Sequence, residues 1–329
     1  MTLPLRLAPL LRLFAVALLA AAPPAAARPA AAQPAEKLTV MLDWFPNPNH
    51  TPLAAARARG DFARVGLEVT LQAPADPSDP LKLAAAGKVD VAIAYQPSVT
   101  MGRSEGLPLV AFGVLVDQPL TTVMALERSG IRRVADLKGK RIGYSVPGFE
   151  EALLGAVLET AGLRLADVSL VDVHFNLTPA LLAGQVAAVV GAYKNYEKIQ
   201  LELEGERVRV FELTEHGVPS YDELVFVTSA ATAGRRPAAL RAFLEGVARG
   251  LARVRQEPAD AFDALVATYP DLKTELNRRA FEATRPLFAR RLAPDPARWE
   301  AFQRFLLARR VIREAVPVAS FVRTDLAPR

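Results

Sequence analysis

Short runs of β-branched and apolar residues alternate along this chain with segments of helical pattern, and this alternation limits the fold more than any other feature. Repeated strand–helix units are typical of an α/β protein with a largely parallel sheet. After residue 228 the pattern predicts helices only, over 237–256, 259–269, 272–288 and 296–309. The predicted strands are 38–43, 68–72, 89–94, 109–116, 141–144, 169–173, 187–192, 208–213 and 224–228, and the helices between them are 52–64, 80–86, 150–161, 179–183 and 194–204.

Two segments of the chain, 80–95 and 179–193, are similar to each other. In each, a short helix stops at a glycine, a buried strand follows, and a tyrosine, Tyr95 or Tyr193, stands at its carboxyl end. The spacing differs by one residue, which leaves chance similarity of two strand–helix units open. If the repeat is real, the two tyrosines occupy equivalent places in two lobes, at the strand ends where α/β sheets bind ligands.

Extended runs at 109–116, 121–126 and 223–228 are where the chain could pass between the lobes. We therefore expect a second lobe over 123–221, inserted into a first lobe made of 36–122 and 222–329. Two crossings form a hinge, and a cleft between hinged lobes captures ligands by closure.

The first 27 residues have the pattern of a secretory signal peptide. Arg6 and Arg12 precede an apolar stretch that runs over 13–22. Pro23-Pro24 and three alanines follow this stretch. The apolar run is about half of the roughly 20 residues that a membrane span needs, so cleavage is favoured over an anchor. Residues 28–35 then form a tether rich in proline and alanine, and the mature protein is expected to be exported and soluble.

Composition excludes several classes of function. The chain of 329 residues has no cysteine, which rules out disulfides, cysteine zinc sites, iron–sulfur clusters and thiol nucleophiles. Three isolated histidines leave little for a metal site, and no cofactor is expected. The net charge of +5 falls to about +3 without the leader. This charge is too small to indicate a nucleic-acid-binding surface. Phosphate-binding, nucleophile-elbow and zinc-protease motifs do not occur.

Polar and aromatic residues gather in three clusters at strand ends. The densest, 43–52, offers Trp44 as a stacking surface, two asparagines that can donate and accept, and His50. The alternative is that Trp44 belongs to the core and His50 is an ordinary loop residue. In the second cluster, Tyr193 and Glu197 are four residues apart and would share a helical face. The third holds Tyr221 beside an acidic pair, 222–223, that could equally be solvated.

A glycine-rich loop over 143–151 joins a predicted strand to a helix. The backbone N–H groups near Gly148 could hold an anion or the polar edge of a ligand, because a helix start has unsatisfied donors. The alternative is an ordinary strand–helix turn. Glu150 and Glu151 in the first turn favour the helix dipole and are poor indicators of catalysis.

Four segments together, 42–52, 87–90, 136–143 and 217–221, resemble the NMT1/THI5-like family of periplasmic binding proteins. The Trp-Phe-Pro-Asn-x-Asn-His-Thr stretch from Trp44 is the most specific part, and the resemblance spans most of 38–230. It implies a two-lobed type II binding fold that delivers a ligand to the membrane permease of an ABC importer. Binders of thiamin pyrimidine precursors such as formylaminopyrimidine are the nearest relatives implied, with riboflavin and aliphatic sulfonate binders as cousins.

The resemblance also implies which residues line the cleft. The first lobe would contribute Trp44, Asn47 and Tyr95, and the second Tyr193 and Glu197. The family's ligand-binding loop falls at 148–150, although the run 146–148 departs from the phosphate-binding sequence of the family's enzyme. With the polar clusters added, the expected ligand-binding set is Trp44, Asn47, His50, Tyr95, Gly148, Phe149, Glu150, Tyr193, Glu197 and Tyr221.

Two classes of function remain. The first is a monomeric periplasmic receptor, without enzymatic activity, for a planar nitrogen heterocycle; Lys194 is the only basic residue in the clusters, which argues against a sulfonate. The second is an exported enzyme related to the family's pyrimidine synthase, acting on a pyrimidine or pyridoxal compound. It would need an acid/base group, and His50 is the only histidine in a candidate cluster. The enzyme's cysteine-rich motif is absent, and this absence and the leader both favour transport.

Overall fold

The computed structural model describes residues 1–2 and 35–328. The expected signal peptide and tether lie outside the described residues, apart from residues 1, 2 and 35. The part beginning at Pro34 is one compact unit. Among the residues that the structure describes, no helix is long and apolar enough to cross a membrane.

Within residues 35–328 the strands form two sheets of five strands each. The first has the order β2-β1-β3-β10-β4 and the second the order β7-β6-β8-β5-β9. We call the part built on the first sheet lobe 1 and the part built on the second sheet lobe 2. The strands of lobe 1 are β1 (Glu36–Met41), β2 (Leu67–Gln72), β3 (Val91–Ala94), β4 (Leu109–Val116) and β10 (Leu224–Ser229), and those of lobe 2 are β5 (Thr121–Leu126), β6 (Arg141–Tyr144), β7 (Ser169–Asp172), β8 (Ala188–Tyr193) and β9 (Val208–Glu212).

The two sheets share one pairing pattern. In lobe 1, β1 is parallel to β2 and β3, while β10 is antiparallel to β3 and β4. In lobe 2, β6 is parallel to β7 and β8, while β5 is antiparallel to β8 and β9. Each sheet is therefore mixed, whereas the sequence predicted a largely parallel sheet. The antiparallel strand in each case is the one by which the chain enters from the other lobe, β5 in lobe 2 and β10 in lobe 1. The pattern makes β3 and β8 equivalent, and Tyr95 and Tyr193 stand at their carboxyl ends.

The chain passes between the sheets twice, once between Val116 and Thr121 and once between Glu212 and Leu224. We call these segments the outgoing and the return crossing. Of the expected domain bounds, the one between 122 and 123 falls inside β5, and the one between 221 and 222 falls in the return crossing. The division of the chain into domains stays a prediction.

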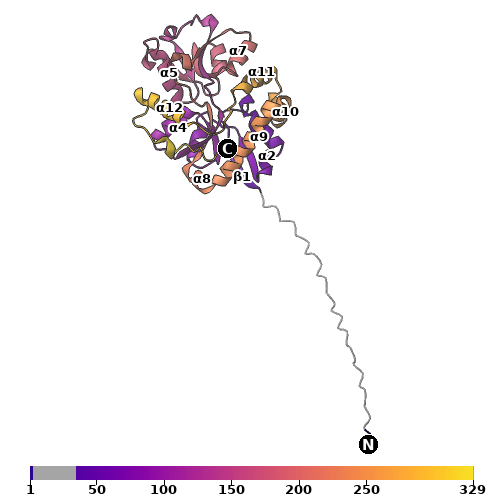
Figure 1. Cartoon of the computed structure of the whole chain (residues 1–329). Coiled ribbons are helices and arrows are strands. Elements are labelled where there is room, and N and C mark those ends of the chain that lie inside the picture. Colours follow the sequence, from indigo (N-terminus) through magenta and orange to yellow (C-terminus); the bar gives the residue numbers. More distant parts are fainter. Residues whose placement is uncertain (3–34, 329) are drawn as a thin grey trace. The chain divides into compact units, whose positions relative to one another are not determined.

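Helices cover both sheets (Figure 1), with α5 and α7 on lobe 2 and α8 and α9 on lobe 1. The predicted helix over 52–64 is broken at Gly60, whose φ of 70° ends the first part. Two helices were not predicted, α4 and α8, and the serine, threonine and glycine content of α4 explains its weak signal. The longer helices are α1 (Thr51–Ala58), α3 (Asp79–Ala85), α4 (Gln96–Ser104), α5 (Phe149–Glu159), α7 (Glu197–Leu203), α9 (Pro237–Gln256), α10 (Pro258–Thr268), α11 (Glu275–Thr284) and α12 (Pro296–Ala308), and the shorter ones are α2 (Asp61–Arg64), α6 (Leu177–Leu182) and α8 (Ala230–Arg235).

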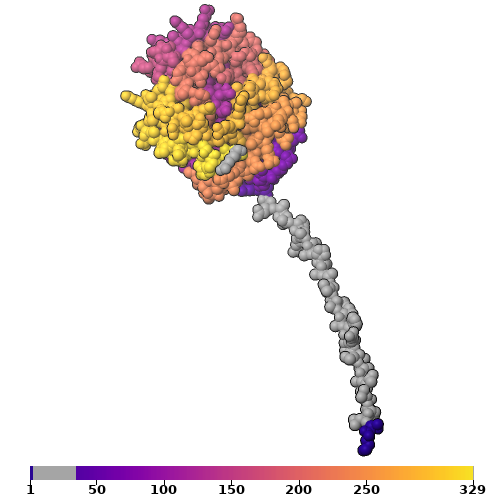
Figure 2. All heavy atoms as spheres, in the orientation of Figure 1, coloured from indigo at the N-terminus to yellow at the C-terminus, as the bar shows by residue number. Residues whose placement is uncertain are grey.

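The C-terminal helices return to both lobes, as the orange and yellow atoms in Figure 2 show on the visible face. Helix α9 packs on α1 in lobe 1, and α11 contacts both the turn at Pro48–His50 and α7 of lobe 2. Of the strands next to the crossings, β4, β5 and β10 are buried along their whole length, whereas β9 is only partly buried. The carboxyl ends of β1, β3 and β8 consequently lie near one another at the junction of the lobes.

Candidate functional site

A cavity lies between the lobes at these strand ends, and the space in it that no atom fills is about 390 Å³ when the part open to solvent is included. Lobe 1 supplies the loop after β1 and the residue after β3, and lobe 2 supplies the starts of β5, α5, α6 and α7 and the end of β8. The residues that line it are Asp43, Trp44, Asn47, Asn49, Tyr95, Thr121, Phe149, Glu150, Leu177, Gly191, Tyr193, Tyr196 and Glu197. A cavity of this kind, aromatic with a few convergent polar groups, is the usual form of a small-molecule site.

Seven of the ten residues expected from the sequence line this cavity. They are Trp44, Asn47, Tyr95, Phe149, Glu150, Tyr193 and Glu197. The structure brings them together from both lobes, and their contact with a ligand stays a prediction. The other three, His50, Gly148 and Tyr221, do not line it.

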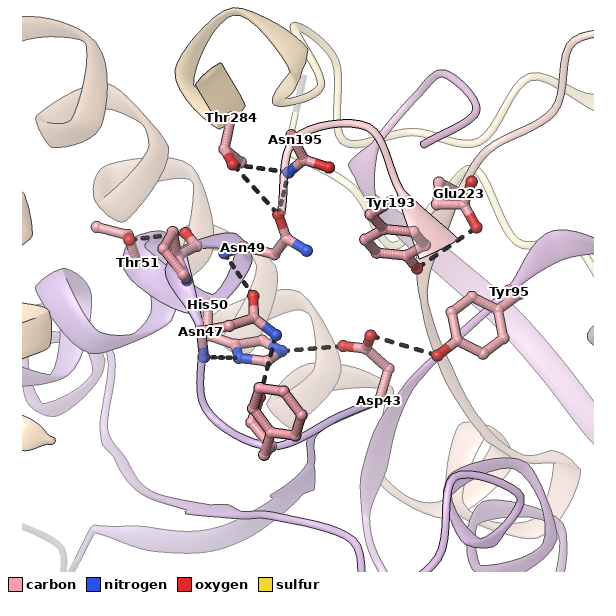
Figure 3. Close-up of polar contacts among 12 residues, drawn as sticks. Asp43, Asn47, Asn49, His50, Thr51, Tyr95, Tyr193, Asn195, Glu223 and Thr284 are labelled. Carbon is pink, nitrogen blue, oxygen red and sulfur yellow. Dashed lines mark hydrogen bonds and ion pairs between the residues drawn. The ribbon is translucent and has the colours of Figure 1, made fainter. Parts of the chain in front are cut away.

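His50 is fully buried behind the cavity wall (Figure 3). Its Nδ1 accepts a hydrogen bond from the backbone N–H of Asn47 at 3.1 Å, so in the neutral ring the proton is on Nε2, which lies 2.9 Å from Oδ1 of Asp43. Both ring nitrogens are therefore occupied within the protein. Contrary to the expectation from the sequence, His50 therefore does not line the cavity, because its position is behind Asp43.

Tyr221 is also fully buried, and its hydroxyl donates to Oε2 of Glu223 at 3.1 Å. Its ring packs edge-on against Phe302 in lobe 1, with 5.3 Å between ring centroids. The neighbouring acidic pair is buried too, with Asp222 2% and Glu223 0% exposed, so neither carboxylate is solvated. Tyr221 is thus part of the return crossing and not of the cavity wall.

Gly148 lies outside the cavity, in a second hollow whose wall includes Met101 and Pro147. The sequence left open whether the N–H groups of its loop hold an anion or the polar edge of a ligand, or form an ordinary turn, and two of them donate to side chains of the protein. The N–H of Ser145 donates to Glu150 Oε2 at 2.7 Å, and the N–H of Gly148 donates to the Glu151 carboxylate. These internal acceptors leave that loop poorly suited to a phosphate.

Asp43 is one of six cavity residues outside the expected set, although it directly precedes the most specific motif. Its Oδ1 faces His50, and its Oδ2 accepts a hydrogen bond from the Tyr95 hydroxyl at 3.4 Å. Its signal was available, since it is the first charged residue after β1. Gly191 and Tyr196 belong to the second cluster, but the sequence assigned them no role at a ligand. Thr121 and Leu177 had no comparable signal, because only the packing of lobe 2 brings them to the cavity.

Three carboxylates line the cavity, and none of the described lining residues is lysine or arginine. Burial raises the pKa of Glu197 to about 7, and burial also raises the pKa of Glu150 well above its ordinary value. Lys194, the nearest basic candidate, instead pairs with Glu212 at 3.0 Å. A ligand that donates hydrogen bonds would relieve the cost of these buried acids, whereas an anion would increase it.

Gly191 makes room for the carboxylate of Glu150. Its φ is 100°, and a Cβ at this position would lie 2.4 Å from Oε1 of Glu150. No other residue type can keep β8 in this conformation with Glu150 in place. The glycine therefore sets where Glu150 stands in the cavity wall.

Trp44 has both of the roles that the sequence left open. It lines the cavity, and it also packs into the apolar cluster of lobe 2 with Leu177 and Leu201. Its ring meets Phe175 of lobe 2 edge-on, with 4.6 Å between centroids. The indole Nε1–H is buried and has no acceptor among the described residues.

Direct hydrogen bonds also join the lobes beside the cavity (Figure 3). The amide nitrogen of Asn195 in lobe 2 donates to Asn49 Oδ1 at 2.9 Å and to the Thr284 hydroxyl of α11 at 2.7 Å. Together with Trp44, these contacts hold the lobes closed around the cavity. Among the described residues there is no group of acidic or histidine side chains that could hold a metal ion.

Two equivalent α/β lobes, joined by two crossings and enclosing a cavity, define this molecule as a protein of the periplasmic binding protein fold. A solved structure with the same architecture is the alkanesulfonate-binding protein SsuA of Xanthomonas axonopodis pv. citri bound to MOPS. The TM-score is 0.69 over 88% of this chain and 98% of that chain, at 20% identity.

The sequence profile described as NMT1/THI5 like matches residues 47–261, and the chain belongs to this family. It is 40% identical over 288 residues to a Haemophilus influenzae protein named for thiamine biosynthesis, covering 87% of this chain and 91% of that protein. It is 37% identical over 231 residues to the formylaminopyrimidine-binding protein of Halalkalibacterium halodurans, covering 70% of each. A 4-amino-5-hydroxymethyl-2-methylpyrimidine phosphate synthase of Legionella pneumophila is 29% identical over 281 residues, 84% of this chain and 88% of that protein.

Proposed function

We propose that this protein is the periplasmic solute-binding component of an ABC importer and that it captures a thiamin pyrimidine precursor of the formylaminopyrimidine type by closure of its lobes. The observation that carries the proposal is the cavity lining, which combines five aromatic side chains with three carboxylates and has no lysine or arginine among its described residues. The relative named as a formylaminopyrimidine-binding protein supports the same class of ligand.

The chemistry of the cavity fits an aminopyrimidine. A flat ring between Trp44 of lobe 1 and Tyr193 of lobe 2 would gain about 0.5–1.5 kcal/mol per aromatic contact beyond burial. The exocyclic amine would donate to Glu197, and the free Nε1–H of Trp44 would donate to a ring nitrogen. Ligand contacts from both lobes then favour the closed state over the open one.

The cavity fits anionic ligands poorly. A sulfonate or a phosphate would lie among Asp43, Glu150 and Glu197 without a lysine or arginine from the described lining to neutralise it. The same argument disfavours a phosphorylated pyridoxal substrate. An enzyme would also need an acid/base group at the ligand, and His50, the candidate for that role, is fully buried with both nitrogens engaged.

Three measurements on the exported protein test the proposal. Mass spectrometry of small molecules released from purified protein should detect an aminopyrimidine, and calorimetry with formylaminopyrimidine should show one site per chain. Incubation should return this ligand unchanged. Turnover of the ligand would support the enzyme, and binding of sulfonates or riboflavin in its place would overturn the ligand assignment.

A further inference from the structure

Glu223 in the return crossing joins three parts of the molecule through one buried carboxylate. Its Oε2 accepts hydrogen bonds from the backbone N–H groups of Leu120 at 2.6 Å and Thr121 at 2.9 Å, and from the Tyr221 hydroxyl. Its Oε1 accepts a hydrogen bond from the hydroxyl of Thr121 at 2.9 Å. It also faces the hydroxyl of Tyr193 at 3.4 Å, as Figure 3 shows. The side chain is 0% exposed, so these donors are its partners in place of water.

The donors come from two distinct places. Leu120 and Thr121 belong to the outgoing crossing and the start of β5, so Glu223 ties the two crossings to each other. Tyr193 ends β8 of lobe 2 and lines the cavity, as does Thr121. The carboxylate therefore contacts both crossings and the hydroxyls of two residues that line the cavity.

Asp222, the residue before it, is bonded differently. Its carboxylate accepts from Arg298 at 2.5 Å and from Trp299 Nε1 at 3.1 Å, both on α12, and its N–H donates to Gln96 Oε1 at 2.7 Å. These partners belong to elements packed on lobe 1, and Asp222 does not line the cavity. Asp222 thus fixes the return crossing to lobe 1. It reaches the outgoing crossing only indirectly, because Arg298 also donates to the backbone carbonyl of Asp117, whereas Glu223 bonds that crossing directly.

We propose that Glu223 is a positioning residue that couples the hinge to the ligand cavity, holding the two crossings together while it sets the hydroxyls of Tyr193 and Thr121. Loss of the carboxylate leaves backbone and hydroxyl donors unpaired in a buried place, and the crossings then separate to reach water. Movement of the crossings changes the angle between the lobes and displaces Tyr193 in the same step. The inference rests on the proposed function only for the choice of ligand.

The test compares Glu223→Gln with the matched control Asp222→Asn. Glutamine keeps the size of the side chain, but its NH₂ group would face hydroxyls that donate to the carboxylate in the native protein. Because the chain has no cysteine, Lys88→Cys in lobe 1 and Lys138→Cys in lobe 2 give a unique pair of spin labels on exposed positions. In ligand-free protein, Glu223→Gln should broaden the distance distribution between the labels, and Asp222→Asn should leave it close to that of the native protein.

Binding of formylaminopyrimidine gives the second measurement. Glu223→Gln should weaken the affinity at least tenfold, and Asp222→Asn should weaken it less than threefold. In a Tyr193→Phe background, Glu223→Gln should cost less affinity than in the native protein, because Tyr193 and Glu223 share a hydrogen bond. A native distance distribution in folded Glu223→Gln protein, or additive effects with Tyr193→Phe, would overturn the inference. If the native protein does not bind formylaminopyrimidine, the proposed function fails, and the label distances still decide the role of Glu223.

Discussion

The Nε2–H of His50 donates to Oδ1 of Asp43 across 2.9 Å, and only Asp43 of this pair faces the cavity. His50 supports the carboxylate from behind, where water does not reach either side chain. The histidine of the most specific motif therefore supports the cavity wall through its neighbour.

Asp43→Asn tests this arrangement. Asparagine keeps an oxygen for the His50 N–H, so the melting temperature should change little, but it removes the charge that faces the ligand. Loss of a charge-assisted hydrogen bond should weaken ligand binding by about 1.5–3 kcal/mol, measured by calorimetry. Unchanged affinity would mean that Asp43 only stabilises the loop after β1 through His50.

The pH dependence of binding should follow Glu197. Its folded-state pKa is raised by burial from 4.5 to about 7, so the ionised form that accepts from an amine is lost as the pH falls below about 7. Affinity should rise between about pH 6 and pH 8, and Glu197→Gln should weaken binding and flatten this profile. A native profile that stays flat would contradict the predicted pKa.

Stability without ligand should show the opposite trend for the same group. Because the pKa is raised on folding, the contribution of Glu197 is fully present below about pH 4.5 and is lost as the pH rises through about 7. The difference between native protein and Glu197→Gln in urea unfolding should therefore change by up to about 3 kcal/mol across this window. An equal difference at every pH would show that Glu197 does not titrate there.

Gly191→Ala should disable the cavity and leave the fold in place. The added Cβ would lie 2.4 Å from Glu150 Oε1, so the carboxylate must move, and ligand binding should fall by at least about tenfold. Gly184→Ala is the matched control, since Gly184 also has a positive φ, 67°, but nothing within 4 Å of its Cβ. Equal loss of binding in both variants would point to backbone strain and not to Glu150.

Tryptophan fluorescence should report ligand binding through Trp44 alone. The chain has two tryptophans, and Trp299 is fully buried beside Asp222, away from the cavity lining. Ligand addition should change the emission of native protein and of Trp299→Phe, whereas Trp44→Phe should give no response. A response that persists in Trp44→Phe would remove Trp44 from the site.

Export predicts a processed amino terminus. Mature protein recovered from the exporting cell should begin near Arg28 or Gln33, because small residues precede both points. Terminal sequencing by mass spectrometry measures this directly. An intact Met1 on soluble exported protein would contradict the signal peptide.

Local pattern was sufficient for most of the fold. Strand β4 and helix α9 lie at the residues that the sequence predicted, because β4 is a continuous apolar run and the apolar residues of α9 repeat with the helical period. The repeat around Tyr95 and Tyr193 was also readable, since each strand–helix unit carries its own glycine stop. Helix α4 was missed because its residues have low helix propensity and tertiary packing stabilises it.

The sequence by itself determined which segments end in polar and aromatic side chains, and so placed Trp44, Tyr95, Tyr193 and Glu197 at strand ends. Only the tertiary structure decided which of these side chains face a common cavity. His50 and Tyr221 are polar aromatic residues like the tyrosines that line the cavity, but each is bonded to a neighbour close in sequence, Asp43 for His50 and Glu223 for Tyr221, and neither faces the cavity. Gly191 and Thr121 reach the cavity because two lobes close around it, and no local pattern encodes a contact between segments that distant.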